Sequence, residues 1–258
     1  MCLLPCVRLL AVDGLVLLGG GGDAVAEREV WSRFLSRPGR ILYWPFALDE
    51  ARVTTASLWF ASQLRILSGD ERDFDTWTSL DGHEPSELED YAVLCVGGGN
   101  TFALLDHVQR HRFLPVIRNW VHRGGAYYGG SAGALLATSC IAVAEVEDRN
   151  DVGLVDFEGL DLLHTRGLLP HFDSTKIDRA HWWNVQFATP ILGLPESSGL
   201  LVDDTGVEVL GPAPATLVSN GTVTTYPAHS RIPQHALSQP SCHLGNDETT
   251  NARQSGQR

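Results

Sequence analysis

The sequence predicts an α/β domain of three layers, in which helices cover both faces of a mostly parallel central sheet. Short, continuously apolar runs recur along the first half of the chain and end in glycine or another breaker: "GLVLLGGGG", "RILYWPFA", "YAVLCVGGGN" and "AYYGG". Helix-like segments separate these runs. Apolar runs without alternation are typical of parallel strands that are buried on both faces, so strand and helix should alternate around one sheet.

The helices between these strands have recognisable ends. The segment between Asp49 and Gly69 is predicted to be a helix that stops at the glycine. In "TFALLDHVQRH", a second helix begins where Asn100 or Thr101 can cap it. A third, "PVIRNWVHRGG", ends at Gly124 just before the fourth strand.

The second half of the domain has more strand-like segments. We expect one helix from Ser174 to Phe187. The segments predicted to form strands are "CIAVAEV", "LDLLH", "PILGLP", "GLLVDD" and "GVEVLG".

Composition limits the domain boundaries and the partners. The 258 residues suit a catalytic domain over 14–226, an N-terminal extension at 1–13 and a disordered tail at 227–258, where large apolar residues become scarce. The 19 Lys and Arg against 31 Asp and Glu give a net charge of −12, which opposes binding to nucleic acid or anionic lipid. Five cysteines without CxxC pairs favour a reducing cytoplasm.

The most informative stretch is "GGAYYGGSAGALLATSC", residues 124–140, where an apolar run breaks into glycines around Ser131. Gly129, Ser131 and Gly133 form GxSxG, the strand-turn-helix that exposes a nucleophilic hydroxyl above a sheet. A packing turn of small residues is the simpler alternative. The strand before Ser131 and the helix formers after it favour the nucleophile.

A serine needs a base to take its proton and a carboxylate to orient that base. His171 in "GLLPHFD" is the preferred base, ahead of His164, and Glu196 in "ILGLPES" is the preferred acid. An α/β-hydrolase would instead use an acid and a later histidine; Asp203 or Asp204, with His229 or a later histidine, could supply them. In that case the histidine would lie in the tail.

Four segments occur in an order and spacing that resemble the peptidase E family of serine peptidases, which includes the cyanophycinases. They are "VGGGNTFALL", "YYGGSAGALLA", "LLPHFD" and "ILGLPES", and the resemblance covers roughly residues 14 to 210. It implies a fold like that of the class I glutamine amidotransferases. It also implies that Ser131 is the nucleophile, His171 the base and Glu196 the acid, with no metal and no organic cofactor.

The tetrahedral intermediate of such a reaction needs two hydrogen-bond donors for its oxyanion. The N–H of Ala132 lies at the start of the helix after the nucleophile, where the helix dipole favours negative charge. Gly98 or Gly99 in the turn "GGGN" is the second candidate, because glycine lets its amide approach a substrate closely.

The glycine run "LLGGGGDA", residues 17–24, also fits the GxGxxA pattern of a dinucleotide site. The following strand does not end in one clear ribose-binding acid. We therefore favour close packing, or a wall of the substrate cleft, for this run.

Peptidase E enzymes are known for cleavage after an N-terminal aspartate, which needs a cation in the pocket. Arg179 is the preferred candidate, Lys176 is the second, and Asn100 is a further substrate-binding candidate. The segment from His171 to Glu196 is shorter than in the best-known Asp-specific members. A different substrate pocket, lined by Trp182 and Trp183, is therefore an alternative.

The sequence thus predicts a cytoplasmic serine peptidase, a monomer or homodimer that cleaves small peptides. Three alternatives remain: a cyanophycinase-like isopeptidase, a non-catalytic member that only binds a ligand, and an esterase of the α/β-hydrolase type.

Overall fold

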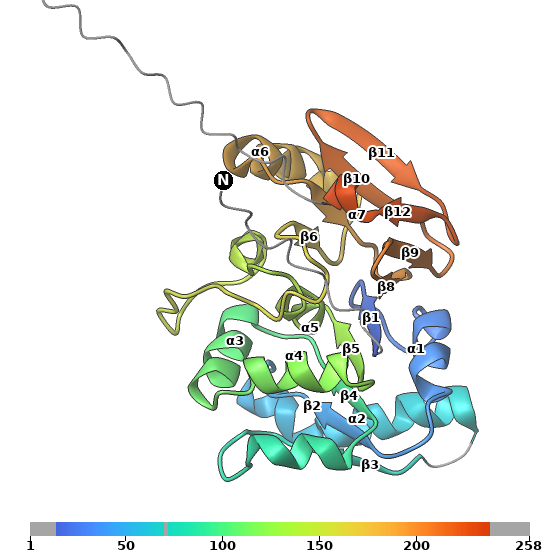
Figure 1. The fold of residues 1–258 in the computed structure, drawn as a ribbon, viewed down its shortest axis with the longest axis vertical. Helices are drawn as coiled ribbons and strands as arrows, with labels where there is room; N and C mark the ends of the chain where they lie inside the picture. The colour runs from blue at the N-terminus through green and yellow to red at the C-terminus, as the bar shows by residue number, and fades with distance from the viewer. Residues whose placement is uncertain (1–13, 70–71, 238–258) are drawn as a thin grey trace, which may run out of the picture.

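The computed structural model describes residues 14–69 and 72–237. A central sheet of eight strands has the order β12-β9-β8-β1-β5-β4-β2-β3 (Figure 1). Its strands are β1 (Leu15–Gly19), β2 (Ile41–Trp44), β3 (Phe74–Thr76), β4 (Val93–Val96), β5 (Ala126–Gly130), β8 (Gly199–Asp203), β9 (Gly206–Leu210) and β12 (Arg231–Pro233). Strands β1, β5, β4, β2 and β3 are parallel to one another, whereas β8, β9 and β12 extend the sheet beyond β1 in antiparallel pairs. The predicted mostly parallel α/β fold is confirmed.

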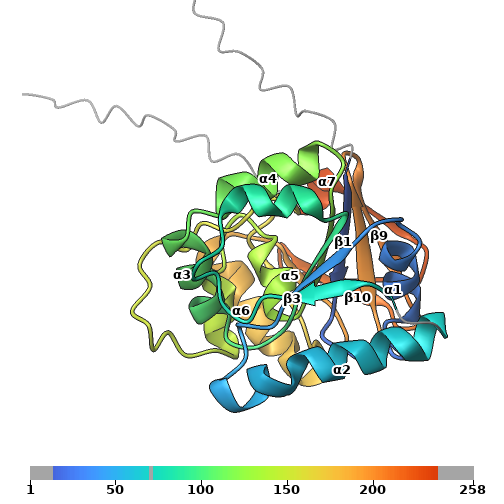
Figure 2. The ribbon, with the colours of Figure 1, turned by 90° about the horizontal axis from the view of Figure 1, so that it is seen from below.

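Helices cover both faces of this sheet, which gives the three layers. The helices of the described residues are α1 (Arg28–Leu35), α2 (Glu50–Ser68), α3 (Thr101–Arg110), α4 (Leu114–His122), α5 (Ala132–Leu136), α6 (Ile177–Phe187) and α7 (Gln234–Leu237), with 3₁₀ turns η1 (Pro85–Asp90), η2 (Ala142–Val146) and η3 (Ser174–Lys176). Of these, α6 packs against a second, smaller sheet. Figure 2 shows α1 and α5 on opposite sides of β1.

The alternation of side chains along each strand explains why both faces need a cover. Leu17 and Tyr128 pack in the core formed with α1 and α2. Their neighbours Leu18 and Tyr127 pack in the core formed with α3, α4 and α5. Because successive side chains point to opposite faces, strands that are apolar at every position leave no face for water.

The predicted helix between Asp49 and Gly69 is confirmed as α2. The Asp49 carboxylate accepts the Arg52 N–H at 3.0 Å and thereby caps the N-terminus. Gly69 ends the helix in the left-handed conformation, with φ of 72°. No helix in the described part of the chain is both long and apolar enough to cross a bilayer.

Two predicted strands are wrong. In "CIAVAEV", Ala142–Val146 forms the 3₁₀ turn η2, and only Cys140 makes an isolated bridge to Glu158. In "LDLLH", Asp161 and His164 have positive φ of 53°, which interrupts an extended strand. The apolar side chains of both segments are nevertheless buried, so their pattern reported burial rather than strand conformation.

A second sheet of four strands in the order β11-β10-β7-β6 was not predicted as a separate unit. Its strands are β6 (Leu168–Leu169), β7 (Ile191–Gly193), β10 (Ala215–Ser219) and β11 (Thr222–Tyr226). This sheet carries the segments on either side of α6, so it places the loops that follow β6 and β7 next to the end of β5.

The tail predicted to begin at Pro227 is partly structured, which corrects that boundary. Strand β12 pairs with β9, and the Ile232 side chain is fully buried in the core that the earlier part of the chain forms. The segment 227–237 looked disordered because it has few large apolar groups, but the ones it has are used in the core. The predicted extension at 1–13 and residues 238–258 lie outside the described residues.

Candidate active site

Ser131 lies at the sharp turn between β5 and α5, as GxSxG predicts. Its backbone has φ of 52°, a positive value that is unfavourable for a residue with a Cβ. The flanking glycines are required by close approach: a Cβ at Gly129 would lie 2.3 Å from the Gly133 carbonyl oxygen, and one at Gly133 would lie 2.3 Å from that of Val96. The turn therefore projects the Ser131 hydroxyl from the carboxyl end of the parallel strands.

His171 lies in the loop after β6, within hydrogen-bond distance of Ser131. Its Nε2 is 2.8 Å from the Ser131 Oγ. Its backbone N–H donates to the Gly20 carbonyl at 2.8 Å, and its φ is 51°. The loop after β1 thus holds His171, whose backbone is strained, in place through this hydrogen bond.

Glu196 follows β7 and completes a line of three side chains. Its Oε1 is 2.7 Å from the His171 Nδ1. If His171 Nδ1–H donates to this carboxylate, Nε2 is left with a lone pair that can accept the Ser131 hydroxyl proton. This arrangement can activate a serine for attack on a carbonyl carbon. Glu196 is 64% exposed, so its role depends on geometry rather than burial.

Of the expected oxyanion donors, Ala132 follows Ser131 directly, Gly98 lies next to it, and Gly99 lines the same cavity. Ala132 is the first residue of α5. A Cβ at Gly98 would lie 3.5 Å from the Ser131 Oγ, so the absence of a side chain there keeps the space in front of the hydroxyl open. Gly99 has φ of 138°, and a Cβ would meet the Ala47 carbonyl oxygen at 2.0 Å. Only glycine suits that position.

A cavity of about 540 Å³ opens beside Ser131 and His171. Three groups of residues line it. They are the glycine turns Gly21, Gly22, Gly97, Gly98 and Gly99, the aromatic residues Trp31, Tyr43, Trp59, Phe60 and Tyr128, and the remaining residues Asp23, Leu48, Arg52, Thr55, Ala56, Gly130, Ser131 and His171. A concave, mostly apolar space with a few polar groups at one end is the usual form of a small-molecule site.

The predicted substrate-binding residues Asn100 and Arg179 do not line this cavity. The Asn100 side chain caps α3 by accepting the Ala103 N–H at 2.9 Å, and its amide donates to the Arg149 carbonyl. Arg179 is exposed on α6, and Lys176 pairs with Glu147 at 2.7 Å. Both basic residues follow His171 closely in sequence, but neither Lys176 at the end of η3 nor Arg179 on α6 lines the cavity.

Trp182 and Trp183 are also outside the cavity. Trp183 is buried and stacks on Phe187 with ring centroids 4.3 Å apart, and Trp182 is 52% exposed. The basic side chain that the cavity does contain, besides His171, is Arg52 on α2. Sequence reasoning missed Arg52 because it lies far from the motifs, in the helix between Asp49 and Gly69.

Glu27 is a second residue that sequence reasoning missed. Its side chain is 1% exposed, and it accepts the N–H groups of Gly21 and Gly22 at 2.8 and 2.9 Å and the Tyr128 hydroxyl at 2.8 Å. Burial raises the pKa of Glu27 to about 7, against the lowering effect of these hydrogen bonds. Glu27 thereby holds the glycine loop that contacts His171.

The dinucleotide interpretation of residues 17–24 fails on the same contacts. A Cβ at Gly20 would lie 1.9 Å from the Pro195 carbonyl oxygen, and a Cβ at Gly21 would lie 2.2 Å from the His171 ring. The run is therefore glycine-rich because it packs against the loops that carry His171 and Glu196. Close packing and a cavity wall, the preferred alternative, are confirmed.

Within residues 14–69 and 72–237, the geometry does not support the α/β-hydrolase arrangement. His229 lies 3.6 Å from Glu29 and 3.9 Å from Glu208, and Asp203 pairs with Arg231 at 2.7 Å. The Ser131 hydroxyl has His171 as its histidine partner instead.

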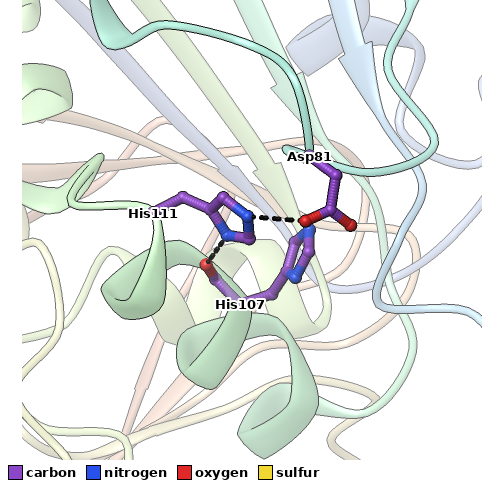
Figure 3. A group of neighbouring side chains, drawn as sticks. All are labelled: Asp81, His107 and His111. Atoms are coloured by element: carbon purple, nitrogen blue, oxygen red, sulfur yellow. Dashed lines mark hydrogen bonds and ion pairs between the residues drawn. The ribbon is translucent and has the colours of Figure 1, made fainter.

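One group outside the cavity has the composition of a metal site. Possible ligand atoms of Asp81, His107 and His111 lie within 4.8 Å of one another at the C-terminal part of α3 (Figure 3). However, the Leu80 N–H donates to the His107 Nε2 at 2.8 Å, and the His111 Nε2 pairs with Asp81 at 3.0 Å. Because an imidazole nitrogen has one lone pair, the Leu80 bond uses the atom that would bind a metal. We interpret the group as a loop-to-helix contact.

Comparisons with known proteins identify the family and the fold of the chain. The chain matches the model of peptidase family S51 over residues 15–210. It is 32% identical over 157 residues to peptidase E of Pasteurella multocida, a match that covers 55% of this chain and 64% of that protein, less than two thirds of its length. It is 27% identical over 217 residues to peptidase E of a Nostoc species, covering 79% of this chain and 86% of the relative.

Among solved structures, a peptidase from an acI-B1 Actinobacterium has the same fold. The two superpose with a TM-score of 0.65 at 18% identity, over 87% of this chain and 98% of the other.

Proposed function

Because the chain belongs to peptidase family S51, we propose that it is a cytoplasmic serine peptidase that hydrolyses a peptide bond in small peptides. The observation that carries the proposal is the pair of hydrogen-bond distances that connect Ser131 to His171 and His171 to Glu196, 2.8 and 2.7 Å. The glycine turns around Ser131 and the adjoining cavity support it.

In the proposed reaction, the Ser131 Oγ attacks the peptide carbonyl carbon while the His171 Nε2 takes its proton. The N–H groups of Ala132 and of Gly98 or Gly99 stabilise the oxyanion. His171 returns the proton to the leaving amine, and an acyl ester on Ser131 remains. Water then attacks the ester with His171 again as base. This chemistry requires no metal or organic cofactor.

Glu196 acts on His171 rather than on the substrate. Its carboxylate holds the tautomer in which Nε2 can accept a proton, and it stabilises the imidazolium that forms in the transition state. An amide at this position would keep the contact but not the charge.

The test is covalent labelling by a fluorophosphonate probe together with hydrolysis of a dipeptide panel. Ser131→Ala should abolish labelling and lower kcat roughly 10⁶-fold, and His171→Ala should have a comparable effect. Glu196→Gln should lower kcat by roughly 10⁴-fold. Ser139→Ala, a second half-buried serine in the same segment, is the matched control.

Labelling that persists in Ser131→Ala would contradict the assignment of the nucleophile. A well-folded wild-type protein that neither reacts with the probe nor hydrolyses any peptide would favour the ligand-binding alternative.

A further inference from the structure

Two kinds of surface line the cavity beside Ser131. One is backbone, contributed by the glycine turns 21–22 and 97–99. The other is an aromatic wall, contributed by α1, β2, α2 and β5 through Trp31, Tyr43, Trp59, Phe60 and Tyr128. Backbone amides suit the main chain of a peptide, and an aromatic wall suits a side chain.

The aromatic wall is held in a fixed arrangement. Tyr43 and Phe60 stack with ring centroids 4.2 Å apart and planes 9° from parallel. The Trp31 Nε1–H donates to the Tyr128 hydroxyl at 3.1 Å, and that hydroxyl donates in turn to Glu27. The polar atoms of Trp31 and Tyr128 are thus paired within the protein, so this part of the wall needs no rearrangement on binding.

Trp59 is the part of this wall that is open to solvent. It is 44% exposed and lies edge-on to the buried Trp31, with centroids 6.3 Å apart. Leu48 and Ala56 line the same region. A ligand that covered Trp59 would remove a large apolar surface from water, which favours binding in proportion to the area buried.

The charges at the cavity do not favour an acidic side chain. Arg52 is the basic side chain at its wall apart from His171, and its Nε already donates to the Asp49 carboxylate at 2.6 Å. Asp23 is an acidic residue of the lining. A substrate carboxylate at Arg52 would lie near the negative charges of Asp49 and Asp23, which offset the attraction of this one cation.

We propose that this cavity is the subsite for the residue whose carbonyl Ser131 attacks, and that it selects peptides in which that residue is aromatic. The proposal rests on the proposed peptidase function and assigns its substrate class. Trp59 is the specificity-determining residue, since it is the exposed face of an otherwise buried aromatic wall.

The test compares dipeptides that share a second residue and carry Phe, Ala or Asp first. Wild-type kcat/KM should be about tenfold or more higher for Phe than for Ala, and lowest for Asp. Trp59→Ala should lower kcat/KM for the Phe peptide about tenfold and leave the ratio of Ala to Asp unchanged. Leu58→Ala, an exposed neighbour on α2 that does not line the cavity, is the matched control.

Two results would overturn the proposal. One is a preference for the Asp peptide that Arg52→Gln removes, which would make Arg52 a receptor for an acidic side chain. The other is a Trp59→Ala effect that is equal for all three peptides. Either result, with fluorophosphonate labelling of Ser131 intact, would leave the peptidase proposal standing.

If no peptide is hydrolysed and Ser131 is not labelled, calorimetric binding of the same dipeptides decides the subsite. Ser131→Ala protein should bind the Phe dipeptide about tenfold more tightly than the Asp dipeptide, and the Trp59→Ala change should remove that difference. Equal binding would contradict the aromatic subsite.

Discussion

Glu27 carries a carboxyl group buried in the core. Its hydrogen-bond partners offset only part of the free-energy cost of burying its charge. It accepts hydrogen bonds from Gly21, Gly22 and Tyr128, and its pKa is nevertheless raised to about 7. Burial disfavours the charged form more than these hydrogen bonds favour it. Glu27 therefore changes charge near neutral pH, directly behind the loop that holds His171.

This titration predicts how stability depends on pH. The pKa of Glu27 is raised from 4.5 to about 7 in the folded state, so between these values the folded protein holds a proton that the unfolded chain has lost. The contribution to the free energy of unfolding is therefore full below pH 4.5 and is lost as pH rises to 7, by on the order of 3 kcal/mol. Glu27→Gln should lack this loss when urea unfolding is compared at pH 5 and pH 8.

Glu50→Gln, at an exposed glutamate on α2, is the control and should behave like wild type. A Glu27→Gln protein with the same pH dependence as wild type would mean that Glu27 does not titrate in this range.

At the scale of elements, the turn between β4 and α3 joins the site to the helix layer. Gly98 lies next to Ser131, Gly99 packs against Ala47, and Asn100 caps the helix directly after them. The Asn100 N–H donates to the Ala47 carbonyl at 2.7 Å, while its side chain caps α3 and contacts Arg149. Asn100, which was predicted from the sequence to bind substrate, therefore holds the turn in place through its contacts with Ala47, Ala103 and Arg149.

This role predicts the effect of two substitutions. Asn100→Ala should lower the free energy of unfolding by about 1 kcal/mol, because the Ala103 N–H loses its acceptor. Asn100→Asp retains an acceptor and places a negative charge at the helix N-terminus, so its stability in urea unfolding should lie closer to wild type. If aspartate is as destabilising as alanine, the cap is not the main function of Asn100.

At the scale of the whole molecule, the last described segment supplies β12, the edge strand on the antiparallel side of the central sheet. Strand β12 pairs with β9, and Ile232 and Leu237 are buried at 0% and 1% exposure. The Thr165 hydroxyl donates to the Leu237 carbonyl at 3.0 Å, which connects α7 to a loop far away in sequence. The fold thus uses residues well beyond the predicted end of the domain.

A chain that stops at Tyr226 should accordingly be less stable than the full chain. Ile232→Ala alone should lower the free energy of unfolding by about 2 to 5 kcal/mol, since it removes a fully buried side chain. Arg231→Ala, at the exposed ion pair with Asp203, should change it by no more than about 1 kcal/mol. Equal urea midpoints for the truncated and full chains would show that β12 and α7 contribute nothing to stability.

Local patterns were sufficient to predict the parallel strands β1, β2, β4 and β5 and the helices α2, α3 and α4. These strands are apolar at every position and end in glycine or another breaker, signals that lie within a few residues. Short apolar runs without such ends were misassigned, as at 140–146 and 160–164, because burial alone does not distinguish a strand from a turn. The four segments that meet around Ser131 were recognised by their order along the chain.

The sequence by itself determined the α/β fold class, the turn that exposes Ser131 and the candidates His171 and Glu196, because each depends on residues close together in the chain. Only the tertiary structure decided which side chains surround them. It placed Arg52 and Trp59 at the cavity instead of Arg179 and Trp182, and it buried Glu27 behind the glycine loop. These positions follow from the packing of helices on a sheet, and distance along the chain says nothing about which helix faces which cavity.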